Sequence, residues 1–293
     1  MMMSDTHEIS SSRLHATIRA QGGELVALSN EDGPALWHGG PEWPRHSPVL
    51  FPIVGRLTDD TLIHEGQSYR LTQHGFARDS LFSWVERSAD RAVLELRDSA
   101  ETLAHYPFRF VLRMIYAVTD DTLSVTTQVS NPAETTLICG VGAHPAFLWP
   151  LAEGIAKEAH RLTFPQAEPG PGLSVDGGLL GSAIPLPFEG TELPLAEGLF
   201  ANDAIVIANV ANRSVRFAAS DEAGRERRAL TVSWEGYKDL GIWSKPTGAP
   251  FLCIEPWYSM ASPAGWQGEF AAKPGILTRA PGESRDFTWR VTL

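Results

Sequence analysis

The sequence lacks the features that would place it in several large protein classes. Its 293 residues include two cysteines, Cys139 and Cys253, and neither belongs to a CxxC pair. That argues against a disulfide framework and against a thiolate zinc site. No window approaches about 18 uninterrupted apolar residues, and the N-terminus has no apolar core of the kind a signal peptide needs. A reducing cytoplasm is the expected location.

Positive charge is scarce as well. The chain has 24 Lys and Arg against 35 Asp and Glu, a formal net charge of −11. Nucleic acid and anionic membrane surfaces need clustered basic side chains, so neither is an expected partner. The chain also has no glycine-rich phosphate loop and no close HExxH-like spacing. We therefore expect no nucleotide cofactor and no metal. A small neutral ligand is compatible with this charge.

Helical periodicity is thin, whereas period-two alternation recurs. Leu123, Val125 and Val129 share one face of residues 122–131, and residues 285–293 and several shorter runs alternate in the same way. A short helix is expected after Ser99, as N-cap, with Pro107 as its stop. Without βαβ alternation, this pattern predicts an all-β fold of antiparallel sheets packed face to face.

The domain organisation follows from the same pattern. We expect one domain over residues 10–293, preceded by a mobile N-terminus at residues 1–9. Residues 165–202 are dense in Gly and Pro, yet they also carry Leu, Ile and Phe. We expect them to pack as a long excursion over one sheet.

Two of the nine histidines have unusual neighbours. His74 stands directly before Gly75, and His144 stands before Pro145 in GAHPAF. A small neighbour lets a ligand come close, and proline fixes the backbone that aims an imidazole. Either histidine, taken alone, is more often a hydrogen-bonded structural residue than a functional one.

Glu255 is a carboxylate inside the apolar run FLCIEPWYSM. Glu is rarely buried without a partner, so it is either half of a buried salt bridge or a base whose pKa is raised by desolvation. In a strand, Cys253 and Glu255 would share one face. Trp257 follows closely, and a flat aromatic face suits the apolar side of a pyranose.

Three further residues have two interpretations each. Arg56 and Arg78 can donate to sugar hydroxyls, or they can pair with acidic neighbours such as Asp79. Asp203 begins a predicted strand, where it is either a ligand contact or a turn residue. Spacing alone does not decide between these alternatives.

Five short motifs occur in a fixed order: FPIVGRL (51–57), QHGFAR (73–78), GAHPAF (142–147), LFANDAIVI (199–207) and CIEPW (253–257). This ordered set resembles the aldose 1-epimerase (galactose mutarotase) family, and within it a bacterial branch of less characterised members. The resemblance runs from about residue 10 to the C-terminus. The set is specific for the family and unspecific for the sugar.

The resemblance implies a β-supersandwich and a cofactor-free isomerase that interconverts the α and β anomers of an aldose. It places the two catalytic histidines of the family on His74 and His144, and the catalytic base on Glu255. As a mechanism, we expect Glu255 to take the proton from the sugar O1, His144 to protonate the ring oxygen O5, and His74 to hold the ring oxygen or the C1 region.

The same resemblance gives Arg56 and Asp203 substrate-binding positions. The better-known galactose enzymes, however, carry an asparagine where this chain has Gly55, and the motif around Asp203 matches less well. The sugar contacts are therefore left open.

Other classes remain open at this point. A non-catalytic sugar-binding module would use the same sandwich and aromatic residues without an acid/base pair. A glycoside hydrolase or lyase would need a second carboxylate beside the bond that it cleaves. The sequence does not name the aldose, says nothing of phosphorylation, and is compatible with a monomer or a homodimer.

Overall fold

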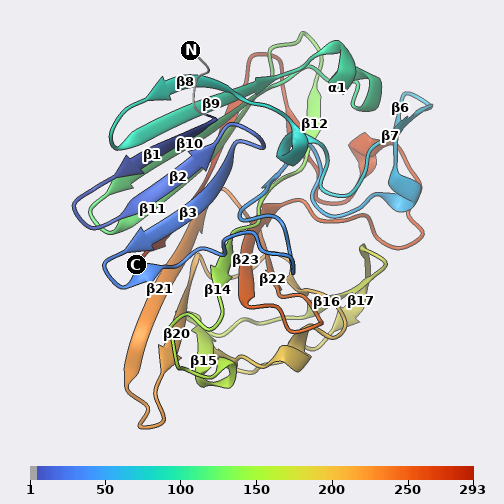
Figure 1. Cartoon of the computed structure of the whole chain (residues 1–293). Coiled ribbons are helices and arrows are strands. Elements are labelled where there is room, and N and C mark those ends of the chain that lie inside the picture. Colours follow the sequence, from blue (N-terminus) through green and yellow to red (C-terminus); the bar gives the residue numbers. More distant parts are fainter. Residues whose placement is uncertain (1–4) are drawn as a thin grey trace.

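The computed structural model describes residues 5–293, and nearly all of its regular structure is β-strand (Figure 1). Two large sheets dominate, and neighbouring strands in both run antiparallel. The predicted all-β, antiparallel fold class is confirmed. No helix among the described residues is long and apolar enough to cross a membrane.

The strands of the two sheets follow a spatial order that differs from their order in the chain. The first sheet has nine strands: β18 (Glu192–Pro194), β15 (His160–Thr163), β20 (Ser214–Ser220), β21 (Glu226–Glu235), β25 (Ser284–Thr292), β11 (Thr122–Ser130), β10 (Val111–Thr119), β9 (Arg91–Arg97) and β8 (Ser83–Arg87). The second has eight: β17 (Leu179–Ile184), β16 (Gly172–Asp176), β19 (Ile205–Ile207), β22 (Asp239–Trp243), β23 (Phe251–Tyr258), β13 (Val141–Ala143) and β5 (Val49–Leu50), with β14 (Ala146–Leu148) also paired to β23.

Smaller elements complete the fold. The strands are a four-stranded sheet of β1 (Thr6–Ser10), β2 (His15–Arg19), β3 (Glu24–Asn30) and β4 (Gly33–Pro34), and the pairs β6 (Thr61–His64) with β7 (Gln67–Arg70) and β12 (Leu137–Cys139) with β24 (Leu277–Arg279). The helices are α1 (Ala100–His105) and 3₁₀ turns at Thr58–Asp60, Ala77–Asp79, Lys157–Ala159, Glu197–Phe200 and Phe270–Ala272. Ser99 caps α1 through a reciprocal capping box with Thr102, as the sequence indicates for its start.

The alternation seen in the sequence sets which side of each strand faces the core. In β11, Leu123, Val125 and Val129 are buried, and in the adjacent β25 Trp289 and Val291 are buried beside them. Burying each large apolar side chain contributes about 1.5–3 kcal/mol. The observed register places the apolar side chains of both strands on the core face, and a shift of one residue would turn them to the other face.

β23 differs because it is a central strand with both faces covered. Leu252 and Ile254 face the main apolar core, which also contains residues of the nine-stranded sheet. Cys253 and Trp257 belong to separate apolar clusters on the opposite face. Glu255 shares that second face, and this placement brings a carboxylate beneath a cavity.

The N-terminal boundary differs from the expectation. Residues 6–10 form β1, which pairs with β2 and contributes the buried Ile9 to the core. Residues 6–9 of the expected N-terminal segment therefore belong to a strand of the domain. Residues 1–4 of that expectation lie outside the described part of the chain.

Residues 165–202 also fold differently from the expected excursion over one face. Their strands β16 and β17 form a hairpin at the edge of the eight-stranded sheet, while β18 pairs with β15 at the edge of the other sheet. The segment therefore extends both sheets at their edges, and its hairpin forms one edge of the second sheet (Figure 1).

Candidate active site

The floor of the candidate site is built on β23. Glu255 lies opposite Gly241 of β22, and Trp257 lies opposite Gly142 of β13. A Cβ atom on Gly241 would lie 2.3 Å from two ring carbons of Trp257. Glycine is required there because the indole lies across the neighbouring strand. The aromatic ring is thereby held flat beside the carboxylate.

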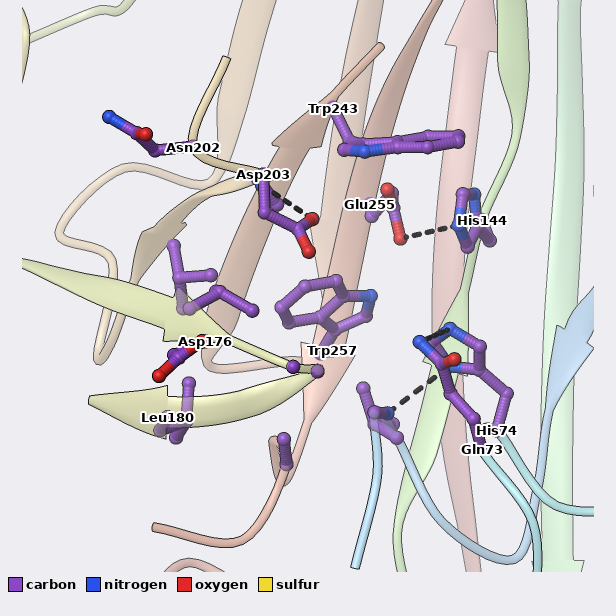
Figure 2. A pocket seen from close by; sticks show the side chains of 18 of the residues that line it. Gln73, His74, His144, Asp176, Leu180, Asn202, Asp203, Trp243, Glu255 and Trp257 are labelled. Carbon is purple, nitrogen blue, oxygen red and sulfur yellow. Dashed lines mark hydrogen bonds and ion pairs between the residues drawn. The ribbon is translucent and has the colours of Figure 1, made fainter. Parts of the chain in front are cut away.

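His144 is carried to Glu255 by the strands on either side of it. β13 ends at Ala143 and β14 begins at Ala146, and both strands pair with β23. The imidazole Nε2 lies 3.3 Å from the Glu255 Oε2 (Figure 2). Both side chains are almost fully enclosed, with 7% of His144 and 2% of Glu255 exposed. The indole of Trp43 packs against the imidazole, with ring centroids 5.0 Å apart.

His74 lies next to this pair, in a turn whose backbone has positive φ angles. Its φ is +65° and that of Gly75 is +69°, both in the left-handed region. The backbone N–H of Gly55 donates to His74 Nδ1 at 3.1 Å, so the proton of the neutral ring lies on Nε2. The His74 and His144 ring centroids are 5.7 Å apart.

Gly75 explains why a glycine directly follows the histidine. A Cβ atom there would lie 2.3 Å from the carbonyl oxygen of Phe51, to which the turn is bridged. We expect Gly75→Ala to lower the free energy of unfolding by roughly 2–4 kcal/mol, through left-handed strain and this collision. Urea denaturation measures it.

Gly66 offers a matched control for that substitution. Its φ is +73°, yet nothing lies within 4 Å of a Cβ built on it. Gly66→Ala should therefore cost only the left-handed strain, about 1–2 kcal/mol. Equal losses in the two variants would show that the Phe51 contact is unimportant.

Burial acts in opposite directions on the two members of the pair. Removal from water raises the pKa of Glu255 well above its ordinary value, against the lowering influence of the Trp257 indole and with a further rise caused by Asp203. The same desolvation lowers the pKa of His144 to about 3. Both shifts favour the uncharged forms, a protonated carboxyl beside a neutral imidazole. Burial also lowers the pKa of His74 well below its usual range.

Above the pair lies a cavity of about 690 Å³, a size that suits a small-molecule ligand. Figure 2 shows Trp243 and Trp257 on either side of Glu255, with Asp203 opposite His144. The walls come from several loops and from the β16–β17 hairpin, with lining residues that include Trp43, Val54, Gln73, Asp176, Leu180, Asn202, Trp243, Pro246 and Ala261.

The predicted site residues fall into two groups. The cavity lining includes Glu255, His144, His74, Trp257, Asp203 and Arg78. Asp203 is exposed at the cavity wall, and its Oδ1 accepts a hydrogen bond from the Ala204 N–H. Arg78 is partly buried and donates to the Gln73 carbonyl at 2.8 Å.

Arg56 is placed differently. Its Nε lies 2.7 Å from Asp60, and its guanidinium is absent from the lining that the described residues form. The local ion pair, which the sequence left as the alternative, is the arrangement found. Arg56 still borders the site indirectly, because its side chain lies beside Gly178 at the hairpin turn.

Sequence reasoning missed several lining residues. Trp43 and Trp243 both stand beside proline- or serine-containing loops, and Asp176 lies in the irregular stretch 165–202. The density of tryptophan, nine in the chain, was a usable signal for Trp43 and Trp243. No local pattern marked Asp176.

Comparison with known proteins is consistent with this geometry. The model of the family described as aldose 1-epimerase matches residues 5–262. The chain belongs to this family. Among curated proteins, LacX of Lactococcus lactis subsp. lactis is 29% identical over 300 residues, covering 98% of this chain and 99% of LacX.

Solved structures of aldose 1-epimerase relatives share the fold. A galactose mutarotase related enzyme from Lactobacillus acidophilus superposes with a TM-score of 0.89 at 28% identity, covering 98% of this chain and 96% of that one. A galactose mutarotase-like protein from Lactobacillus casei gives 0.87 at 28% identity, covering 98% and 99%. The galactose mutarotase-like sandwich expected from the motifs is thereby confirmed.

Proposed function

We propose that the protein is an aldose 1-epimerase that interconverts the α and β anomers of a free sugar. The observation that carries this proposal is the buried Glu255–His144 pair, 3.3 Å apart, on the floor of a cavity of about 690 Å³. A non-catalytic binding module gains nothing from enclosing two titratable groups whose charged forms burial disfavours. An enzyme that must remove one proton and deliver another needs such a pair.

The proposed reaction uses Glu255 and His144 in opposite roles. Glu255 accepts the proton of the sugar O1 while His144 donates a proton to the ring oxygen O5. The C1–O5 bond then breaks and C1 becomes an aldehyde. After rotation about the C1–C2 bond, the two transfers run backwards and the ring closes on the other face. Each proton transfer contributes about 10²–10⁴ in rate.

The uncharged forms that burial favours suit this cycle. Glu255 then carries one carboxyl proton, and the contact between Oε2 and Nε2 lets this proton move to the imidazole before Glu255 takes the proton of O1. One proton leaves O1 and one arrives at O5, so the pair ends as it began. The reaction needs no proton from bulk water.

His74 has a different part in this proposal. Because Nδ1 accepts from Gly55, the ring proton lies on Nε2, which is 3.4 Å from the Gln73 side-chain amide, and the lowered pKa keeps the ring neutral. A neutral donor can hold O5 or the aldehyde oxygen of the open chain without competing for the transferred proton. We assign it to positioning the ring oxygen.

Polarimetry tests the proposal directly. Fresh α-glucose and α-galactose should lose optical rotation faster with the protein than without it. Sugar binding without acceleration would favour a binding module. Release of reducing sugar from an aryl glycoside would favour a hydrolase.

The charge at the cavity favours an uncharged aldose. Among the lining residues that the structure describes, Arg78 is the one Lys or Arg, whereas Asp176, Asp203 and Glu255 are acidic. A phosphate dianion would meet the exposed carboxylates of Asp176 and Asp203, with Arg78 as the one lining cation to offset them. We expect kcat/KM for glucose 6-phosphate to be at least about tenfold below that for glucose, a difference of about 1.4 kcal/mol.

A charge-removing variant checks the cause of that preference. Asp176→Asn leaves Glu255, His144 and His74 intact and takes one negative charge from the hairpin. The glucose 6-phosphate rate should rise relative to glucose. A wild-type protein that prefers the phosphate would overturn the assignment of an uncharged substrate.

A further inference from the structure

Beside the proposed proton-transfer pair lies a third buried group that the proposed reaction does not use. Cys253 is fully buried, and in β23 it is two residues before Glu255 on the same face of the strand. One donor atom from each of His144, Cys253 and Glu255 lies within 4.8 Å of the other two. Residues 144 and 253 are far apart in sequence, so no linear spacing reveals the cluster.

We infer that His144, Cys253 and Glu255 form an inhibitory binding site for a thiophilic divalent cation such as Zn²⁺. Metal binding is a different function from the proposed activity and would inhibit it, because a bound cation would occupy the groups that transfer protons. Its ligand set of one imidazole, one thiolate and one carboxylate is one that zinc accepts.

The geometry is close to what zinc needs. Three atoms within 4.8 Å of one another have a common point no farther than about 2.8 Å (4.8/√3) from any of them. Zinc binds nitrogen, oxygen and sulfur at about 2.0–2.3 Å. Shifts of roughly 0.5–0.8 Å, within the reach of side-chain rotation, would therefore close the site.

Burial distinguishes this cluster from an ordinary surface group of ligands. All three side chains are at least nine-tenths buried, and the His144 Nδ1 has no hydrogen-bond partner within residues 5–293. His144 and Glu255 also line the cavity, so a cation can arrive from solvent and keep a fourth position for water or a sugar oxygen. The exposed carboxylate of Asp203 on the route favours cations over anions.

A bound metal ion would block proton transfer because it would occupy the atoms that accept and donate the proton. The thiol and carboxyl protons leave to solvent as the metal arrives, since zinc is bound by thiolate and carboxylate. The ligating nitrogen and oxygen then donate their lone pairs to the metal. Neither Glu255 nor the coordinated imidazole nitrogen can exchange a proton with a sugar until a chelator removes the ion.

The first test measures metal binding without sugar. Zinc sulfate competed against a chromophoric chelator should show one ion per chain. Cobalt(II) in its place should give a thiolate-to-metal charge-transfer band and the visible spectrum of a four-coordinate site. Wild-type protein that takes up no zinc, or whose cobalt spectrum lacks the thiolate band, would overturn the proposal without any variant.

The second test uses the two cysteines as a matched pair. Cys253→Ser should weaken zinc binding by at least about 100-fold, while its mutarotation rate in chelator stays near that of wild type. Cys139→Ser is the control, because Cys139 is equally buried but lies in β12 and belongs to no group of three potential ligands among residues 5–293. Equal zinc affinity in wild type and Cys253→Ser would exclude Cys253 as a ligand.

These outcomes are independent of whether the protein is a mutarotase. Zinc uptake and the cobalt spectrum report on the site even if no sugar is converted, and polarimetry in chelator reports on the activity even if no metal binds. If both hold, zinc should lower the wild-type rate at least about tenfold and leave Cys253→Ser near its metal-free rate, with chelator reversing the loss.

Discussion

Replacing Glu255 by Gln should reduce kcat for mutarotation by about 10²–10⁴, which is about 3–5 kcal/mol of transition-state stabilisation. An amide keeps the shape of the side chain but cannot accept the O1 proton. Stopped polarimetry or exchange NMR on α-glucose measures the loss. Because burial already favours the uncharged carboxyl, the uncharged amide should leave the melting temperature nearly unchanged.

Asp203→Asn is the control for that variant. Asp203 lines the same cavity, but it is exposed and its Oδ1 accepts a hydrogen bond from the Ala204 N–H. We expect it to raise KM with a smaller effect on kcat, as removal of a binding contact does. A wild-type rate in Glu255→Gln would end the assignment of Glu255 as base.

Replacing His144 by Asn should cause a loss of similar size, about 10²–10⁴ in kcat. Asparagine can hold a hydrogen bond to Glu255, but it cannot carry a proton to O5. The two side chains act as one unit, so the double variant with Glu255→Gln should lose little more than either single variant.

His74→Asn separates positioning from proton delivery. Asparagine tolerates the left-handed backbone at this position, so the fold should persist. We expect a loss of about tenfold to a hundredfold, the cost of one hydrogen-bond donor. A larger loss at His74 than at His144 would exchange the roles proposed for the two histidines.

In the proposed mechanism, the same pair determines the pH dependence of kcat/KM. The lowered pKa of His144, about 3, keeps the imidazole from gaining a second proton until strongly acidic pH. The raised pKa of Glu255 keeps the single proton on the pair as pH rises past the ordinary carboxyl value of 4.5. The acid limb of kcat/KM should therefore lie far below 6.5, the ordinary value for histidine.

The sequence predicted the floor of the site better than its rim. Alternation assigned β11 and β25, and it placed Cys253 and Glu255 on one face of β23, because period-two patterns survive wherever one face is buried. The motif order brought His74, His144 and Glu255 into one hypothesis. Their proximity is observed, while their roles stay proposals until the variants are measured.

The rim could not be predicted because its geometry depends on tertiary contacts. Asp176 reaches the cavity only because β16 and β17 pair at a sheet edge, and the sequence around them has no clear period. Arg56 was equally compatible with a sugar and with an acidic neighbour, and a carboxylate four residues away decided the matter. Trp43 comes from a loop whose path no local pattern specifies.

The hairpin of β16 and β17 has a consequence for how this scaffold can diversify. Glu255 lies on the interior strand β23, and His144 lies between β13 and β14, which both pair with it, whereas the hairpin turn at Gly177 and Gly178 borders the same cavity from the sheet edge. Peripheral turns accept insertions and exchanges that interior strands do not. In the proposed enzyme, grafting a different turn there should change which sugar is accepted and leave the proton-transfer residues unchanged. Selectivity and turnover can then evolve separately.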